Sequence, residues 1–393
     1  MATKQSAVRL VEKTEAKSAR SAIVALRDEV RKTVYELDEV VDLSVVALLG
    51  RVHLCLLGKP GAAKSKVTTE ITKRLTGAKL FVRLLTKTST PEELFGPIML
   101  SGLRNDRYVR NTQGYLPEAH VGFADEVFKA NSAILNSLLT LMNEREYDND
   151  GKRSKCPLVT LFGASNELPQ EEGLNAMWDR FVLRTVVDYM ADEGSYKALF
   201  ASRATQASMP APTAFVALET LQAAQEEVAK VALPDTVVER LLVLRRELMK
   251  AKVEVSPRRW SDSIPVLQAR AWLSGRDTIV EDDLLVLEHV LWANMEQRTA
   301  VRKVVNQVIN PEREQALALY DTAASAWREF EALPAEQQSA RAGEFGPKIR
   351  GAGEKLKALV NKLTESDRPV GDLPAKLEVL RSWHKQMVEK LMG

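Results

Sequence analysis

Short apolar runs alternate with helical patterns over the first half of the chain. Runs of this length, bounded by polar residues or glycine, are typical of buried strands. They lie at residues 52–57, 80–84, 121–124, 158–164 and 182–187. Between the third and fourth runs, apolar side chains recur at helical spacing, namely Ile134, Leu135, Leu138, Leu139 and Met142. Strands separated by helical segments predict an α/β protein with a parallel, doubly wound sheet.

Helical patterns dominate the rest of the chain. Residues 23–49 precede the first strand with a helical pattern, and residues 214–305 form amphipathic helices that include 237–249 and 259–273. A polar stretch at residues 204–213 suggests a boundary. Ala316, Leu319, Ala323, Trp327 and Phe330 recur at helical spacing further on, which predicts a helical hairpin or a three-helix extension with Trp327, Phe330 and Trp383 in its core. We predict domains at 1–195, 196–305 and 306–393.

Two polar segments have the residues of hairpin loops. Residues 101–119 are punctuated by glycine and Asn-Asp, and residues 147–155 contain Asp150-Gly151, a strong two-residue turn signal. Both segments carry cations, namely Arg104, Arg107, Arg110, Lys152, Arg153 and Lys155. The cations either bind an acidic partner or a nucleic acid, or belong to a solvated loop. A helix is expected between the second and third strands, with Thr90 as N-cap, Pro91 at its first position and Glu93 closing a capping box.

The segment GKPGAAKS follows the first strand and opens a helical stretch. Its residues are Gly58, Lys59, Pro60, Gly61, Ala62, Ala63, Lys64 and Ser65. Glycines at this turn let backbone N–H groups surround a phosphate, and the following helix directs its positive end at the same anion. Lys64 is expected to reach the β- and γ-phosphates, and the Ser65 hydroxyl to ligate Mg²⁺. Ala63 stands where the GxxxxGK[ST] pattern has its second glycine, and as a small residue it is expected to cost little.

Polar side chains also follow two later strands. Asp125 and Glu126 end the third apolar run, and Asn166 follows the fourth. Ligands of open α/β sheets bind at the carboxyl ends of the strands, so Asp125 is expected to face Mg²⁺ and Glu126 the water that attacks the γ-phosphate. Asn166 could hold that water without adding charge. The alternative for Asp125 and Glu126 is an acidic helix N-terminus, which the helix dipole favours.

Five motifs in this order and spacing resemble the AAA+ ATPases, specifically the MoxR branch. They are GKPGAAKS, FADE, GASN, DRF and SPRR, and STPEELFGP, GYLPEA and AILNSLLTLMNERE are similar to the RavA-type subgroup. The resemblance covers roughly residues 20–300. It implies an AAA+ phosphate-loop core with a parallel five-stranded sheet, a helical lid and a helical C-terminal extension. It also implies a ring, expected to be a homo-hexamer, that hydrolyses ATP with Mg²⁺ to remodel or activate a partner protein, possibly one with a von Willebrand factor A-type domain.

The resemblance assigns two arginines to catalysis. It gives Arg180 the role of a finger that reaches the γ-phosphate of a neighbouring subunit, whereas the residues alone allow a simple pair with Asp179. It gives Arg258 a nucleotide-sensing role. Arg258 and Arg259 lie in the first turn of a predicted helix capped by Ser256, where the dipole disfavours cations, so an anion is expected nearby. Arg259 could substitute for Arg258 or cap the domain surface.

Composition narrows the remaining choices. The 393 residues carry 55 basic and 53 acidic side chains, a net charge of +2, which counts against the alternative of a nucleic-acid motor or loader. Cys55 and Cys156 lie in or beside apolar runs, which predicts buried thiols in a reducing compartment, and the four histidines have no metal-ligand spacing. The first 20 residues lack the apolar core of a secretory signal, and no run reaches the ~18 apolar residues of a membrane span. We therefore expect a cytoplasmic protein without a membrane span.

Overall fold

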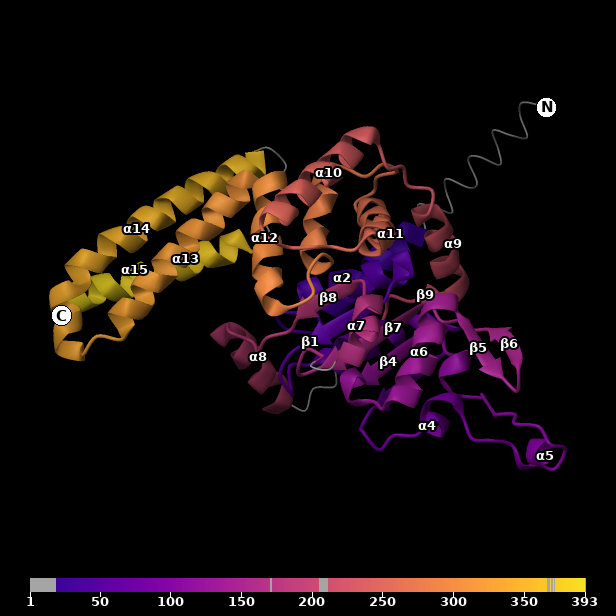
Figure 1. Ribbon diagram of the computed structural model, residues 1–393. Helices are drawn as coiled ribbons and strands as arrows, with labels where there is room; N and C mark the ends of the chain where they lie inside the picture. The colour runs from indigo at the N-terminus through magenta and orange to yellow at the C-terminus, as the bar shows by residue number, and fades with distance from the viewer. Residues whose placement is uncertain are drawn as a thin grey trace. The chain divides into compact units, whose positions relative to one another are not determined.

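The structure is a computed structural model that describes residues 19–169, 172–204, 211–365, 368, 370 and 372–392. Residues 1–18 and most of the predicted boundary at 204–213 lie outside these ranges. The chain forms two compact units, which we describe separately. The first unit runs to Val238 and adds Val255–Ile279 and Val286–Arg298, and the second takes Glu239–Glu254, Val280–Leu285 and the chain from Thr299. Figure 1 labels helices and strands along the chain. The domain boundaries at residues 195 and 305 remain a prediction.

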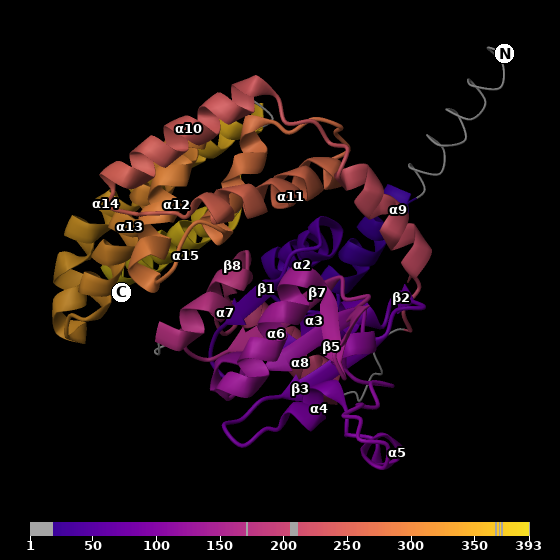
Figure 2. The same ribbon diagram turned by 45° about the vertical axis from the view of Figure 1, so that its right-hand side comes forward.

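A five-stranded parallel sheet organises the first unit, as predicted. Its strands, in spatial order, are β3 (Leu80–Leu84), β4 (Val121–Asp125), β7 (Thr160–Ser165), β1 (Leu54–Leu57) and β8 (Leu183–Val186). Figure 2 labels β3, β7, β1 and β8 of this sheet. Leu57 at the end of β1 is in register with Ser165 and Val186 at the ends of β7 and β8. The carboxyl ends of these strands therefore meet at one edge of the sheet, where ligands of this fold class bind.

Burial follows from the position of each strand in the sheet. All residues of β1 and β7 are buried, because parallel strands in the middle of a sheet are covered on both faces. Helix α2 (Asp38–Gly50) packs against β1 and β8, and α3 (Lys64–Thr72) packs against β4 and β7. The edge strand β3 differs, since Leu80, Val82 and Leu84 alternate along it and are exposed.

The remaining elements of the first unit connect and flank these strands. A helix at residues 19–31 is separated from α2 by a turn in which Glu36 has φ +55°, so the single helical pattern predicted over 23–49 is two helices. The other elements of this unit are β2 (Leu75–Thr76), α4 (Pro91–Phe95), α5 (Leu100–Leu103), η1 (Leu116–Glu118), η2 (Val127–Lys129), α6 (Ser132–Glu144), η3 (Glu172–Leu174), α7 (Asn175–Arg180), α8 (Glu193–Ala204), β9 (Val216–Ala217), α9 (Leu218–Val228) and α11 (Pro257–Leu273).

Helix starts follow the sequence signals. Pro91 is at the first position of α4, and the Thr90 amide donates to the Glu93 carboxylate at 3.2 Å, as the capping box predicts. Ser256 caps α11, because its hydroxyl accepts a hydrogen bond from the Arg259 amide at 3.2 Å. Both predicted helix starts are confirmed.

The two predicted hairpins have different outcomes. Strands β5 (Glu146–Asn149) and β6 (Lys152–Lys155) form an antiparallel hairpin around Asp150 and Gly151, both with positive φ, as predicted. The segment predicted as a hairpin loop at 101–119 shares one antiparallel bridge, Ile98 with Arg110, and its tip carries the short helix α5. The helical turn at its tip was not predicted, because the polar residues and glycines around it indicated a loop.

Three elements lie partly in each unit: α10 (Asp235–Lys250), the 3₁₀ helix η4 (Glu281–His289) and α12 (Met295–Ile309). Before η4, Ala232 and Thr278 form a single parallel bridge.

The second unit contains three long helices, α13 (Pro311–Glu331), α14 (Ala335–Glu365) and α15 (Leu373–Met392). They share a buried core in which Phe330 is 1% exposed. The rings of Trp327 and Trp383 stack at 5.4 Å between centroids. The three-helix form of the predicted extension and the core role of its aromatic residues are confirmed.

Candidate functional site

The segment Gly58 to Ser65 forms a tight loop at the end of β1. The Gly58 amide donates to the Ser165 carbonyl at 3.0 Å, and a Cβ on Gly58 would lie 2.1 Å from the Val187 carbonyl oxygen, so only glycine fits there. Gly61 has φ +83°, a conformation that favours glycine. The loop therefore has the backbone shape that presents N–H groups to an anion.

Ala63 corrects one expectation. It is the N-cap of α3 and has φ +58°, in the left-handed region that L side chains rarely adopt. An alanine at this position is therefore strained, although its small size suggested little cost. Strained residues of this kind persist where the surrounding structure holds them, often at functional sites.

Lys64 is held at the centre of the strand ends. Its Nζ donates to Asn166 Oδ1 at 2.9 Å and to the Ser165 carbonyl at 3.3 Å, and it also contacts the Gly58 carbonyl. Burial lowers the pKa of Lys64, while the charges of Asp125 and Glu126 oppose that shift. The structure thus brings together a buried cation, a neutral amide and two carboxylates from three different strands.

Asn166 links the lysine to the acidic pair. Its Nδ2 donates to Glu126 Oε1, and Glu126 Oε2 forms an ion pair with Lys129 Nζ at 3.3 Å. Glu126 has φ +52°, so its backbone is in the left-handed region directly after β4. The strain at this position favours a functional role over that of an ordinary acidic helix N-terminus.

Asp125 and Ser65 are the two predicted Mg²⁺ ligands. Asp125 ends β4, and its Oδ1 accepts a hydrogen bond from the Glu126 amide at 3.0 Å. Ser65 lies in the first turn of α3 with an exposed side chain. A hydroxyl and a carboxylate are oxygen ligands of the kind Mg²⁺ takes beside a nucleotide. The strained loop, the buried lysine and these oxygens fit a magnesium-bound triphosphate.

Arg180 and Arg258 lie near the amino ends of the strands, opposite the carboxyl ends that Lys64 follows. Arg180 ends α7 directly before β8, and its buried Nε has no hydrogen-bond partner in the described part of the chain. Arg258 donates to Asn143 Oδ1 at 3.1 Å. The neighbouring Met142 carbonyl contacts the ring of His53 at 3.2 Å, and His53 directly precedes β1. Both arginines therefore lie toward the amino ends of β1 and β8, whereas Lys64 follows the carboxyl end of β1.

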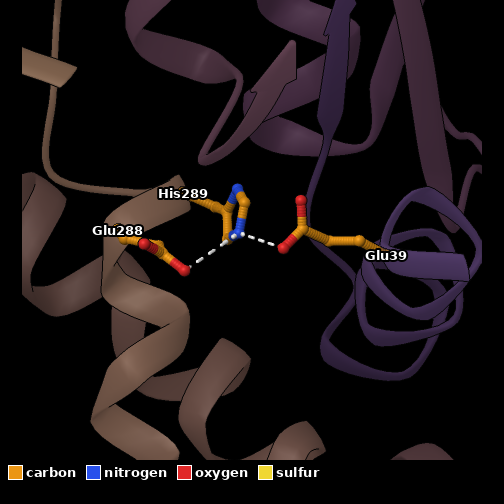
Figure 3. Close-up of side chains that lie close together, drawn as sticks. All are labelled: Glu39, Glu288 and His289. Carbon is orange, nitrogen blue, oxygen red and sulfur yellow. Dashed lines mark ion pairs between the residues drawn. The ribbon is translucent and has the colours of Figure 1, made fainter. Parts of the chain in front are cut away.

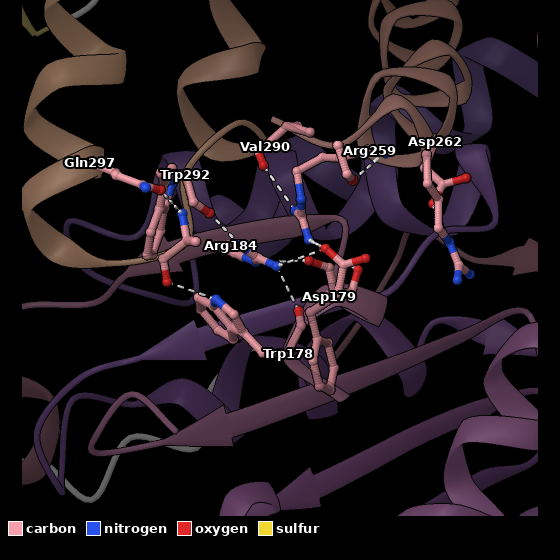
Figure 4. A network of polar contacts seen from close by, with 12 residues as sticks. Trp178, Asp179, Arg184, Arg259, Asp262, Val290, Trp292 and Gln297 are labelled. Atoms are coloured by element: carbon pink, nitrogen blue, oxygen red, sulfur yellow. Dashed lines mark hydrogen bonds and ion pairs between the residues drawn. The ribbon is translucent and has the colours of Figure 1, made fainter. Parts of the chain in front are cut away.

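Arg259 is buried in a polar network, unlike its neighbour. It is 6% exposed, donates to the Val290 carbonyl at 2.9 Å and pairs with the Asp179 carboxylate at 2.5 Å (Figure 4). Asp179 therefore binds Arg259, and the simple Arg180–Asp179 pair that the residues allowed is not formed. Arg258 is 46% exposed at its side chain and, among the described residues, its side chain contacts Asn143 and, at 3.4 Å, Asp262. Of the two arginines, Arg258 is the one free to reach an anion.

Arg184 completes this network and was missed at the sequence level. It lies within β8, is 1% exposed, and donates to the carbonyls of Trp178, at 2.7 Å, and Trp292. Its guanidinium sits 3.9 Å from the centroid of the Trp178 ring. The signal in the sequence was an arginine inside an apolar run, which in a buried strand requires carbonyl and aromatic partners.

A second cluster joins α2 to η4. His289 Nε2 lies 3.3 Å from Glu39 Oε1 and 3.7 Å from Glu288 Oε1 (Figure 3). Burial lowers the pKa of His289, but the two carboxylates outweigh burial and the pKa is raised. These three side chains are the one group in the described ranges whose ligand atoms lie close enough for a metal ion. Ion pairing already accounts for their geometry.

The two hairpins are tied to each other. Asp150 accepts hydrogen bonds from Arg107 Nε and from the Tyr108 amide, both at 2.8 Å. Arg110 pairs with Glu92 at 2.9 Å, and its amide donates to Asn149 Oδ1. Two of the cations considered for binding an acidic partner or a nucleic acid, Arg107 and Arg110, are therefore engaged within the protein.

The two cysteines are buried and free, as predicted. Burial raises the pKa of Cys55 to about 12 and that of Cys156 to about 11, which disfavours the nucleophilic thiolate form of both. None of the helices in the described ranges has the length and apolarity that crossing a bilayer requires.

Comparison with known families gives two matches. Residues 21–226 match the family described as the MoxR domain of MoxR-vWA-beta-propeller ternary systems. Residues 236–305 match the AAA lid domain. The matched segments cover the sheet, the loop, the acidic pair, Asn166 and all the arginines discussed above.

Similar proteins agree with these matches. The chain is 36% identical over 294 residues to the uncharacterised protein MJ0079 of Methanocaldococcus jannaschii, covering 74% of this chain and 76% of that protein. It is 26% identical to chaperone MoxR1 of Mycobacterium tuberculosis, covering 67% and 74%. A crystal structure of a proposed ATPase from Cytophaga hutchinsonii superposes with a TM-score of 0.62 at 18% identity, covering 75% of this chain and 96% of that one, which supports the fold.

Proposed function

Because the chain belongs to the MoxR family of AAA+ ATPases, we propose that it hydrolyses ATP with Mg²⁺ in a ring of identical subunits and uses the energy to remodel or activate a partner protein. The observation that carries this proposal is the chain of contacts from Lys64 through Asn166 to Glu126 at the carboxyl edge of the sheet. These are the charges and the amide that hydrolysis of a phosphoanhydride requires.

Each residue has a role set by its position. The loop amides and Lys64 bind the triphosphate, and Ser65 and Asp125 would hold Mg²⁺, which when bound neutralises charge on the phosphate oxygens. Glu126 accepts a proton from water, because it is the carboxylate that Asn166 orients. Asn166 positions that water with an amide, which adds no negative charge near the phosphates.

The arginines complete the site of a neighbouring subunit. Arg180 and Arg258 lie at the sheet edge opposite Lys64, so neither serves the nucleotide of its own subunit in this geometry. In a ring, the amino ends of the strands in one subunit face the nucleotide site at the carboxyl ends of the strands in the next. An arginine supplied across that boundary raises the rate of hydrolysis by about 10³- to 10⁵-fold. We propose a hexamer on the basis of the resemblance.

The partner is proposed to be a protein. The name of the matched family refers to MoxR-vWA-beta-propeller systems, which supports a partner with a von Willebrand factor A-type domain. The RavA-type subgroup remains a prediction from the motifs. Arg107 and Arg110 are paired within the chain, which weakens the nucleic-acid alternative.

We place the protein in the cytoplasm, supported by its two free buried thiols.

A mixing experiment tests the site and the ring together. Lys64→Ala should abolish ATP binding, and Arg180→Ala should bind ATP without turnover. When the two inactive variants are mixed, a Lys64→Ala subunit can supply Arg180 to an intact nucleotide site next door, so ATPase activity should partly return.

The matched control mixes Lys64→Ala with Glu126→Gln, where the second site stays inactive whatever its neighbour supplies. Recovery is then expected only in the first mixture. If neither mixture recovers activity while the wild-type protein assembles and hydrolyses ATP, arginine supply between subunits is wrong. If the wild-type protein binds no ATP, the whole proposed function fails.

A further inference from the structure

Tyr189 is a half-exposed aromatic residue that is tied to the phosphate loop. Its hydroxyl donates to the Pro60 carbonyl at 3.0 Å, and Lys59 Nζ lies 5.7 Å from the centroid of its ring. The side chain is nevertheless 53% exposed. The polar end of the side chain is satisfied by the protein, whereas much of its apolar ring faces solvent.

The backbone around Tyr189 is fixed on both sides. The Val187 amide donates to the Leu57 carbonyl at 2.6 Å, directly before the loop. The amides of Ala191 and Asp192 donate to the Glu36 carboxylate at 2.9 and 3.1 Å. These bonds hold the segment against the loop, so the ring is presented in a defined place.

The order of the strands tells which end of a nucleotide would lie at this ring. Asp125, Glu126 and Asn166 follow β4 and β7, on one side of β1. Tyr189 follows β8, on the other side of β1. If the reacting phosphate points to the acidic pair and Asn166, the nucleoside leaves the loop toward β8.

We infer that Tyr189 is a stacking platform for the base of the bound nucleotide. This inference rests on the proposed ATP site and assigns it a residue for the nucleoside. An aromatic ring binds a base through its face, and such stacking tolerates any base because each has a π-face. Tyr189 is a binding residue that adds affinity for the nucleoside without touching the reacting phosphate.

Binding calorimetry with Mg-ATP, Mg-ADP and inorganic tripolyphosphate tests the inference. Tyr189→Ala should weaken ATP and ADP by about 5- to 150-fold, the range for loss of one base stack, and leave tripolyphosphate unchanged. Tyr189→Phe keeps the ring and loses only the bond to Pro60, so it should bind ATP nearly as well as the wild type. Tyr196→Ala, an exposed tyrosine of α8, is the matched control and should change neither ligand.

The outcomes separate the possible failures. Equal losses of ATP and tripolyphosphate affinity in Tyr189→Ala would make Tyr189 a brace for the loop and overturn the inference. Unchanged ATP affinity in Tyr189→Ala would overturn it as well. A wild-type protein that binds neither ATP nor tripolyphosphate would instead refute the proposed function from which the inference starts.

Discussion

Lys64 Nζ donates a hydrogen bond to Asn166 Oδ1 at 2.9 Å, across 102 positions of sequence. The contact joins the loop after β1 to the residue that follows β7, its neighbour in the sheet. Because the Nδ2 of the same amide donates to Glu126, any movement of Asn166 changes its hydrogen bonds to both Lys64 and Glu126, the proposed base.

Asn166→Ala is expected to separate binding from turnover. Lys64 and the loop amides remain to hold the phosphates, so ATP affinity should change less than about threefold. Loss of the amide leaves the water and Glu126 unpositioned, and kcat should fall by about 10²-fold, within the range for a misplaced general base. Steady-state ATPase rates and equilibrium binding of ATP measure the two effects. A variant with wild-type kcat would show that Asn166 is not needed for turnover.

Arg258 and Arg259 are adjacent in sequence but should respond differently to substitution. Arg259→Ala removes a buried guanidinium that donates to the Asp179 carboxylate and the Val290 carbonyl, and should lower the free energy of unfolding by about 2 kcal/mol. Arg258→Ala removes exposed contacts and should change it by less than about 0.5 kcal/mol. Urea unfolding of both variants measures the difference.

ATPase assays of the same pair distinguish structure from catalysis. Arg258→Ala should lose activity while remaining as stable as the wild type, because its proposed role is at a neighbouring nucleotide. If Arg258→Ala keeps full activity at a protein concentration where the ring is assembled, the sensing role is wrong.

Ala63→Gly is expected to stabilise the loop. Glycine adopts φ +58° without the clash that alanine carries, and replacements at such positions change stability by about 1 kcal/mol. Thermal and urea unfolding should show this gain. Ala62→Gly, in the same loop but without positive φ, is the matched control and should not stabilise the protein. An Ala63→Gly protein that is less stable than the wild type would show that backbone strain at Ala63 does not destabilise the loop.

The sheet was predictable because each strand left its own local signal. Apolar runs bounded by glycine or polar residues gave the strands, and the sites followed because carboxyl ends of parallel strands share one edge. This rule placed Asp125, Glu126 and Asn166 at that edge, and the GKPGAAKS motif placed Lys64 beside them. The capping box at Thr90 and the Asp150-Gly151 turn were equally local and are confirmed.

Other features depend on tertiary contacts that no local pattern encodes. The difference between Arg258 and Arg259 arises from which one turns toward Asp179, and both lie in the same first turn of α11. Arg184 has its partners 3 to 108 positions away. The strain at Ala63 is a property of its φ angle, which side-chain size does not reveal. The link between the hairpins at Asp150 pairs two segments that the sequence treated separately.

The raised pKa of His289 predicts that the stability of the protein depends on pH. Its pKa is raised in the folded protein, where burial opposes ionisation but Glu39 and Glu288 outweigh both burial and the repulsion from Arg298. A group of this kind stabilises the fold fully below its unfolded pKa, near the ordinary value of 6.5, and the stabilisation is lost as pH rises through the folded pKa. The free energy of unfolding of the wild type relative to His289→Gln should therefore be largest near about pH 5.5 to 6 and shrink toward pH 8.5.

Urea unfolding at a series of pH values measures this difference. Glu39→Gln removes one of the two carboxylates and should flatten the pH dependence without abolishing it, since Glu288 still faces the ring. Addition of Zn²⁺ or a chelator should not alter the wild-type curve, because a proton on His289 already satisfies both carboxylates. A difference between wild type and His289→Gln that stays constant across the pH range would show that folding does not raise the pKa of His289.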